Sequence, residues 1–257
     1  MDSRQNLLHA FGLLNWHIEL GVTEAIGDAP VDRYALDPGA PKGTSQTVPS
    51  APMLVHHDDK IDPVAEARVM AHAASDLEAL RSAMAIYTRC DLKKGARSLV
   101  FSDGVPGARV MIVGEAPGRD EDREGRPFVG RAGKLLDRML GAIGLDRAQS
   151  IYITNVLPWR PPENRDPKPG EIAMMTPFLE RHVALAAPDV LVLMGNISCQ
   201  TVLGRRGITR LRGQWTKAMG RSTLPMFHPA YLLRQPHAKR AAWADLLSLQ
   251  ARLDERT

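Results

Sequence analysis

Three polar residues that could do chemistry each lie at the end of an apolar run. Glu115 follows the run Arg109-Val-Met-Ile-Val113, Asn155 closes Ile151-Tyr-Ile-Thr, and His228 follows Leu224-Pro-Met-Phe. A carboxylate can activate a water, an amide can pair with a donor and an acceptor together, and an imidazole can donate to a developing negative charge. Apolar runs of this length indicate buried strands, and open α/β sheets bind their ligands at the carboxyl ends of strands.

The elements that must position these residues alternate along the chain. The patterns predict strands at 109–113, 151–156, 189–194 and near 224–228, and helices near 131–143, 169–186, 196–203 and 231–251. Such alternation is typical of a parallel sheet with helices on both faces. We therefore expect an α/β fold with three layers, α/β/α, around a central, mainly parallel four-stranded sheet.

The front third of the chain has a different character. Apolar residues recur at helical spacing over residues 6–20, whereas residues 27–62 are rich in Pro, Gly, Asp, Ser and Thr. A further helix is expected from Pro63 to about Tyr87, with Asp62 as its N-cap. The sequence thus predicts an N-terminal helical extension over 1–84, with a flexible linker at about 27–62, and a catalytic domain over 85–257.

Composition and charge limit the classes of function. The 257 residues contain no apolar run long enough to span a membrane and no signal peptide, so a cytoplasmic location is expected. Cys90 and Cys199 are too few for a disulfide framework or a four-thiolate site. Residues 1–84 carry a net charge of −6, so the rest of the chain carries +10. That basic balance fits a nucleic-acid-binding protein, and ordinary solvated charge is the alternative.

The glycines after the first strand do not form a nucleotide-binding motif. Gly114 and Gly118 are spaced wrongly for a Walker loop or a Gly-x-Gly-x-x-Gly fingerprint. A turn of this kind lets backbone N–H groups approach a ligand, so the amide of Ala116 is a candidate donor to a base carbonyl or a phosphate. A tight turn without a ligand is the alternative.

The three motifs together resemble the family 4 uracil-DNA glycosylases. The resemblance is carried by Val113-Gly-Glu-Ala-Pro-Gly118 with Gly125-Arg-Pro-Phe-Val-Gly130, by Tyr152-Ile-Thr-Asn-Val-Leu-Pro-Trp-Arg160, and by His228-Pro-Ala-Tyr-Leu-Leu-Arg234. It covers roughly residues 85–250. It implies a DNA repair enzyme that flips uracil out of DNA, hydrolyses its N-glycosidic bond and leaves an abasic site.

The resemblance also implies roles for individual residues. Asn155 would pair with uracil O4 and N3–H, Phe128 would stack on the flipped base, and His228 would stabilise negative charge at O2. Glu115 would orient or activate the attacking water. Gly114 and Ala116 are further substrate-binding candidates, because their turn brings backbone groups close to a ligand. An Asx-turn, a core phenylalanine and a structural histidine are the alternatives for Asn155, Phe128 and His228.

Two further roles concern base choice and DNA. Glu121 matches a family position near the C5 edge of uracil, where it could exclude the methyl group of thymine, although the acidic cluster around it could be solvated surface. The segment 229–234 resembles the family loop that wedges into DNA, so Tyr231, Leu232 and Arg234 are DNA-binding candidates, with an ordinary helix start as the alternative. Plausible phosphate contacts are Arg160, Arg165, Arg205, Arg206, Arg210, Arg212 and Lys217.

The chain departs from the family at the iron–sulfur cluster. Typical members hold the cluster with four cysteines, and the corresponding positions here are Tyr87, Cys90, Trp159 and Met175. We therefore expect a cluster-free branch, with no cofactor and no metal. Covalent relatives carry a histidine in an inserted basic loop, which is absent where Gly125-Arg-Pro-Phe128 follows the first motif. The expected partner of this monomer is uracil-containing DNA, single- or double-stranded, and a catalytically silent binder of damaged DNA is the alternative function.

Overall fold

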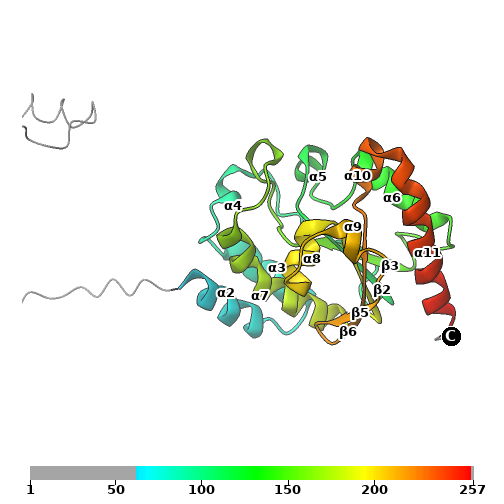
Figure 1. The fold of residues 1–257 in the computed structure, drawn as a ribbon. Coiled ribbons are helices and arrows are strands. Elements are labelled where there is room, and N and C mark those ends of the chain that lie inside the picture. Colours follow the sequence, from blue (N-terminus) through cyan, green and yellow to red (C-terminus); the bar gives the residue numbers. More distant parts are fainter. Residues whose placement is uncertain (1–61, 256–257) are drawn as a thin grey trace, which may run out of the picture. The chain divides into compact units, whose positions relative to one another are not determined.

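The structure is a computed structural model that describes residues 62–255 (Figure 1). Its centre is a six-stranded sheet with the strand order β1-β3-β2-β4-β6-β5. The four inner strands run parallel, as the sequence predicts, and the outer two are antiparallel. The strands are β1 (Asp103–Gly104), β2 (Val110–Gly114), β3 (Ile151–Asn155), β4 (Val190–Met194), β5 (Thr216–Ala218) and β6 (Arg221–Met226).

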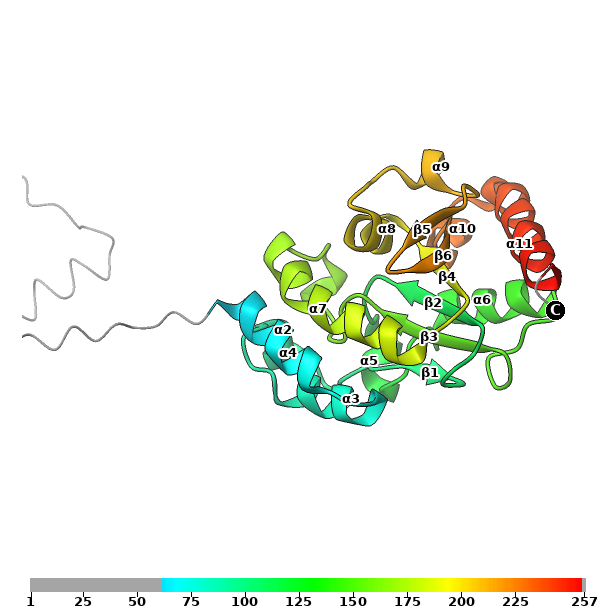
Figure 2. The same cartoon turned by 90° about the horizontal axis from the view of Figure 1, so that it is seen from below.

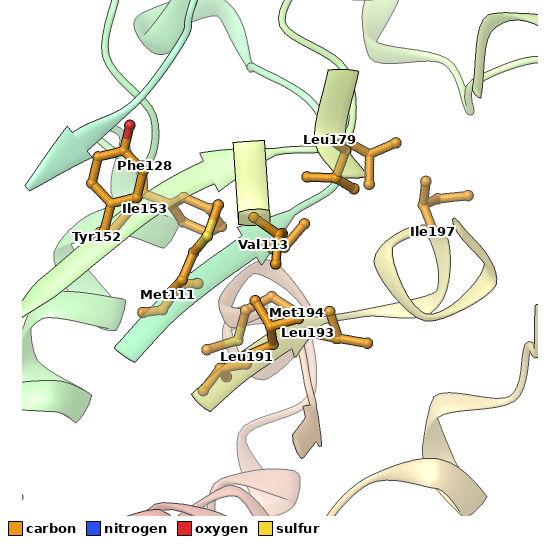
Figure 3. Packing of buried hydrophobic residues seen from close by; sticks show 14 of the residues in the cluster. Met111, Val113, Phe128, Tyr152, Ile153, Leu179, Leu191, Leu193, Met194 and Ile197 are labelled. Carbon is orange, nitrogen blue, oxygen red and sulfur yellow. The ribbon is translucent and has the colours of Figure 1, made fainter. Parts of the chain in front are cut away.

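The inner strands form the core because both of their faces are covered. Every residue of β2, β3 and β4 is buried, which fits their nearly continuous apolar sequences. Met111 on β2 lies opposite Leu191 on β4, and Val113 lies opposite Leu193; Figure 3 shows these side chains packed side by side. The edge strands β1 and β5 were missed by the sequence patterns because two and three residues are too short for a periodic signal.

Helices lie on both faces of the sheet (Figure 2). The β2–β3 connection includes α5 (Arg119–Glu124) and α6 (Arg131–Gly141), and α10 (Pro229–Arg234) and α11 (Lys239–Asp254) pack against α6. The β3–β4 and β4–β6 connections carry α7 (Pro169–Ala186), α8 (Asn196–Leu203) and α9 (Ile208–Leu211). Right-handed crossovers that move in opposite directions along a sheet put α6 and α7 on opposite faces.

Two predicted helices are each divided in the structure. The helix expected over 63–87 becomes α2 (Pro63–Ala73) and α3 (Leu77–Ile86), because the Asp76 carboxylate accepts from Ala79 N over 2.9 Å and starts a new helix. The helix expected over 231–251 is broken before Pro236, which begins a short 3-10 turn between α10 and α11. The prediction that Asp62 caps α2 is confirmed by its hydrogen bond from Val64 N.

The first described helices belong to the same compact unit as the sheet. Both α2 and α3 pack against α7, so the described residues before position 85 share one compact unit with the sheet. The boundary expected at residues 84 and 85 therefore falls inside this unit. The helix expected over 6–20 and nearly all of the expected linker lie outside the described residues. None of the helices within residues 62–255 is both long and apolar enough to cross a membrane.

Candidate active site

The carboxyl ends of the parallel strands bring the three polar residues together. Gly114 is the last residue of β2, and it pairs with Asn155, the last residue of β3. Glu115 follows Gly114 directly, and His228 comes two residues after the end of β6. Because these strands run in one direction, their ends open onto one edge of the sheet.

A pocket of about 200 Å³ lies at this edge. Its volume is below the roughly 300–1,000 Å³ of pockets for drug-sized ligands, so it suits one small ring. The lining includes every residue proposed to contact the base except Gly114; it consists of Glu115, Ala116, Pro117, Gly118, Glu121, Phe128, Ala132, Asn155, Pro161, Asn164, Arg165, His228 and Ala230.

Asn155 is held at the wall of the pocket by close packing. A Cβ at Gly114 would lie too close to Asn155 Oδ1 and 2.6 Å from the Phe128 ring, so any larger residue there would displace both side chains. Asn155 is 7% exposed, and its side-chain amide makes no hydrogen bond to another described residue. The amide therefore keeps a donor and an acceptor for a ligand, which the alternative Asx-turn would have used.

His228 presents one nitrogen to the pocket. Its Nδ1 accepts a hydrogen bond from Ala230 N over 3.1 Å, so the neutral ring carries its proton on Nε2. Burial, with a smaller contribution from Arg234, lowers the pKa of His228 to about 4. The ring is therefore a neutral donor at physiological pH. Its centroid lies 5.4 Å from that of Phe128, with 30° between the planes.

Glu115 is half-buried, and both a negative and a positive residue influence its pKa. Burial raises its pKa, Asp166 raises it further, and Arg206 partly opposes the shift. All three residues line a second cavity of about 410 Å³ that shares Glu115 and His228 with the pocket and also reaches Asn196 and Arg234. The sequence patterns missed Asp166, whose signal was its position directly after Asn164-Arg165 in a loop that follows a strand end.

Glu121 contacts the backbone of two loops. Its Oε2 accepts from Gly118 N over 3.1 Å, while its Oε1 accepts from Val129 N over 3.1 Å and from Gly130 N over 2.9 Å. Glu121 is therefore not simply part of a solvated acidic surface. The Ala116 N–H, by contrast, has no acceptor within residues 62–255 and borders the pocket.

Helix α10 corrects one DNA-binding assignment. Leu232 is 1% exposed and belongs to the core, where α10 packs against α6. Its neighbour Leu233 is 39% exposed. Tyr231 is half-buried, with its ring 4.9 Å from that of Phe227, and Arg234 is exposed beside the second cavity. The exposed apolar side chain of this segment is therefore Leu233.

The basic candidates fall into two groups. Arg165 lies against Glu171, with Nη1 2.9 Å from Oε2, and Arg212 is similarly paired with Asp245. Arg160 donates to Asn164 Oδ1 over 2.8 Å. Among the candidates, Arg205, Arg206, Arg210 and Arg234 are exposed, and their guanidinium groups make no hydrogen bond within residues 62–255.

The four residues that the sequence analysis compares with the family's cluster ligands are all buried. Tyr87, Cys90, Trp159 and Met175 are all at most 3% exposed. The Tyr87 ring meets the edge of Phe178 at a centroid distance of 5.4 Å, and its hydroxyl donates to Pro63 O over 2.8 Å. Cys90 is the single thiol among the four, and residues 62–255 contain no group of three His, Cys, Asp or Glu side chains that could hold a metal.

The chain is similar to one protein family and to several known proteins. Residues 101–247 match the uracil DNA glycosylase superfamily. A type-4 uracil-DNA glycosylase of Sulfurisphaera tokodaii is 38% identical over 184 residues, which cover 68% of this chain and 83% of that protein. Those of Archaeoglobus fulgidus and Thermotoga maritima are each 41% identical, over 59% and 57% of this chain and 80% and 78% of their own lengths.

Proposed function

The chain belongs to the uracil DNA glycosylase superfamily, and from this premise we propose that it hydrolyses the N-glycosidic bond of uracil in DNA and leaves an abasic site. The observation that carries the proposal is the pocket in which Glu115, Phe128, Asn155 and His228 meet. It combines a ring for stacking, an amide for the base edge, a neutral donor and a carboxylate. A small planar base that carries carbonyl and N–H groups matches that set.

Base recognition would use Asn155, the backbone and His228. The Asn155 amide would donate to O4 and accept from N3–H, a pattern that cytosine cannot match because it carries an amino group at C4. The Ala116 N–H would reach a second carbonyl of the base or a phosphate. Phe128 would stack on the ring, and Glu121 would border the C5 edge of the base, where thymine carries its methyl group.

Bond cleavage would depend on charge at both ends of the breaking bond. As the bond from the sugar C1′ to N1 breaks, the electron pair stays on uracil, and His228 Nε2–H stabilises the anion at O2 without transferring its proton. Glu115 stabilises the cationic sugar and accepts a proton from the water that attacks C1′. A low pKa for His228 and a raised pKa for Glu115 suit a neutral donor and a base.

DNA would lie over α10 and the second cavity. We assign the wedge that fills the vacated stack to Leu233 beside Tyr231, since Leu232 is buried. Arg206 and Arg234 border the cavity next to Glu115, which suits them to the phosphates that flank the flipped nucleotide. Arg160 and Arg165, which already bond protein groups, would mainly shape the loop that carries Asn164.

We also propose that this chain works without an iron–sulfur cluster. A cluster needs thiolate ligands, and the phenol of Tyr87, the indole of Trp159 and the thioether of Met175 do not fit that requirement. Their burial against neighbours such as Phe178 supports apolar packing in place of the cluster. Protein purified without oxygen should contain no stoichiometric iron; iron together with visible cluster absorbance would contradict this proposal.

The decisive test of the function is excision from a uracil-containing oligonucleotide. We expect abasic product from uracil, none from thymine or cytosine in the same sequence, and loss of product in a Glu115→Gln variant. Binding of uracil-DNA without any product would instead support the alternative of a catalytically silent binder. Single- and double-stranded substrates should be compared in parallel, since either is expected to be accepted. The monomeric state and the cytoplasmic location stay predictions from the sequence.

A further inference from the structure

Phe128 has a backbone conformation that its side chain does not favour. Its φ is +55°, in the left-handed region that non-glycine residues adopt rarely. The same residue supplies the ring beside His228 at the wall of the pocket. A relaxed backbone at Phe128 would turn this ring out of its place, so surrounding groups must hold the loop.

Arg147, which is not among the residues that line the pocket, supplies the most direct of these contacts. Its Nη2 donates to Phe128 O over 2.7 Å, and its Nη1 donates to Pro127 O over 2.8 Å. One guanidinium therefore bonds two successive carbonyls, the second of which belongs to the strained residue. The planar fork of arginine suits this geometry, whereas lysine offers its donors from a single point.

Two carboxylates fix the orientation of the guanidinium. Asp137 on α6 accepts from Arg147 Nε over 3.0 Å, and Asp103 on β1 accepts from Arg147 Nη1 over 2.9 Å. The Arg147 side chain is only 18% exposed, so solvent screens these contacts less than it would on an open surface. Arg147 is thereby tied to a helix and a strand as well as to the loop.

Residues of α5 and α6 also hold the loop. Glu121 accepts from the N–H groups of Val129 and Gly130, the two residues that follow Phe128. A Cβ at Gly133 would lie 1.7 Å from Phe128 O, so glycine is required there for α6 to approach the loop. Contacts before and after Phe128 therefore fix its peptide groups, and Arg147 holds the carbonyl.

We propose that Arg147 is a positioning residue that holds the Phe128 ring in place for stacking on the flipped base. The inference rests on the proposed function, because it assumes that Phe128 contacts uracil. Arg147 itself would touch neither DNA nor base. Its effect on excision should therefore act through Phe128 and disappear when the ring is removed.

The test is a double-mutant cycle with Arg147→Lys and Phe128→Ala, read as single-turnover excision of uracil and as inhibition by free uracil. Arg147→Lys should slow excision about tenfold or more, since small misplacements of a bound group are costly, and should weaken inhibition by uracil. In the Phe128→Ala background the same change should have little further effect. Arg181→Lys is the matched control, because Arg181 also makes two guanidinium bonds, to Ala74 O, but away from the pocket.

Each outcome decides the proposal. If Arg147→Lys excises at the wild-type rate, or slows excision equally with and without the Phe128 ring, Arg147 does not position that ring. A loss of similar size in Arg181→Lys would also contradict it. Should Arg147→Lys fail to fold, Asp137→Asn takes its place in the cycle, with a smaller loss expected in the same direction. Wild-type protein that excises no uracil would contradict the proposed function itself, which separates the two failures.

Discussion

The carboxylates of Glu115 and Asp166 line the same cavity, and the charge of Asp166 raises the pKa of Glu115 above the value set by burial. Arg206 lines that cavity too and acts in the opposite direction. The basicity of the proposed water-activating group is thus set by residues from three separate loops. A carboxylate with a raised pKa is a stronger base, provided that the pH is high enough to ionise it.

Glu115→Gln should lower single-turnover excision by roughly 10²-fold or more, the scale of general acid–base assistance. The amide keeps the size of the side chain but cannot accept the water proton. Affinity for uracil-DNA should stay within a few-fold, because Glu115 is not expected to hold the phosphates. Equal losses of binding and excision, measured by titration and quenched time courses, would move the water-activating role to another residue.

The acid limb of the pH–rate profile should lie above the pKa of an ordinary glutamate, because only ionised Glu115 is active and its pKa is raised. Asp166→Asn removes the neighbouring negative charge, so the limb should move to lower pH. Arg206→Gln removes the opposing charge and should move it to higher pH, which makes the pair a matched test. An acid limb that does not move in either variant would show that another group controls it.

Asn155→Asp should reduce uracil excision steeply. An ionised carboxylate cannot donate to O4, but it could accept from the amino group of cytosine. The measurement is single-turnover excision from matched oligonucleotides that contain uracil or cytosine at the same position. Wild-type excision of uracil by this variant would mean that Asn155 does not contact the base edge.

Leu233→Ala should weaken excision from duplex DNA, whereas Leu232→Ala should lower folding stability. Leu233 is exposed, so its truncation should leave stability within about 0.5 kcal/mol but weaken excision from duplex DNA, where a vacated stack must be filled. Leu232 is buried, so its truncation should cost about 2–5 kcal/mol of unfolding free energy. Urea denaturation and duplex excision assays compare the two; duplex excision unaffected by Leu233→Ala would contradict the wedge assignment.

Folding stability should fall as the pH is lowered below about 6.5, partly through His182. This residue is buried against Phe101 and Tyr152, and burial lowers its pKa from 6.5 to about 3. Between these values the unfolded chain binds the proton and the folded chain does not, so stability rises with pH, by about 1.4 kcal/mol per unit for this group. His182→Phe should flatten that slope in urea titrations at several pH values, although it loses the Tyr152 contact; an unchanged slope would exclude His182 as the source.

The amino-acid sequence by itself determined the parallel α/β core and the place of its chemistry. Uninterrupted apolar runs identify the inner strands, because a strand covered on both faces must be apolar throughout. Glu115, Asn155 and His228 follow such runs directly, so their gathering at one edge is a consequence of strand direction. Local signals of this kind also predicted Asp62 as a cap and the bounds of α7 and α8.

Only the tertiary structure decided which side chains meet across the chain. Arg147 bonds Phe128 and Asp103, and Asp166 lines the same cavity as Glu115, although no local pattern relates these segments. The choice between Leu232 and Leu233 depended on the orientation of a single helical turn against α6. The short edge strands likewise form because a neighbouring strand offers unpaired backbone groups. Periodicity reports how one segment divides between core and solvent, whereas these features depend on what lies opposite that segment in the folded chain.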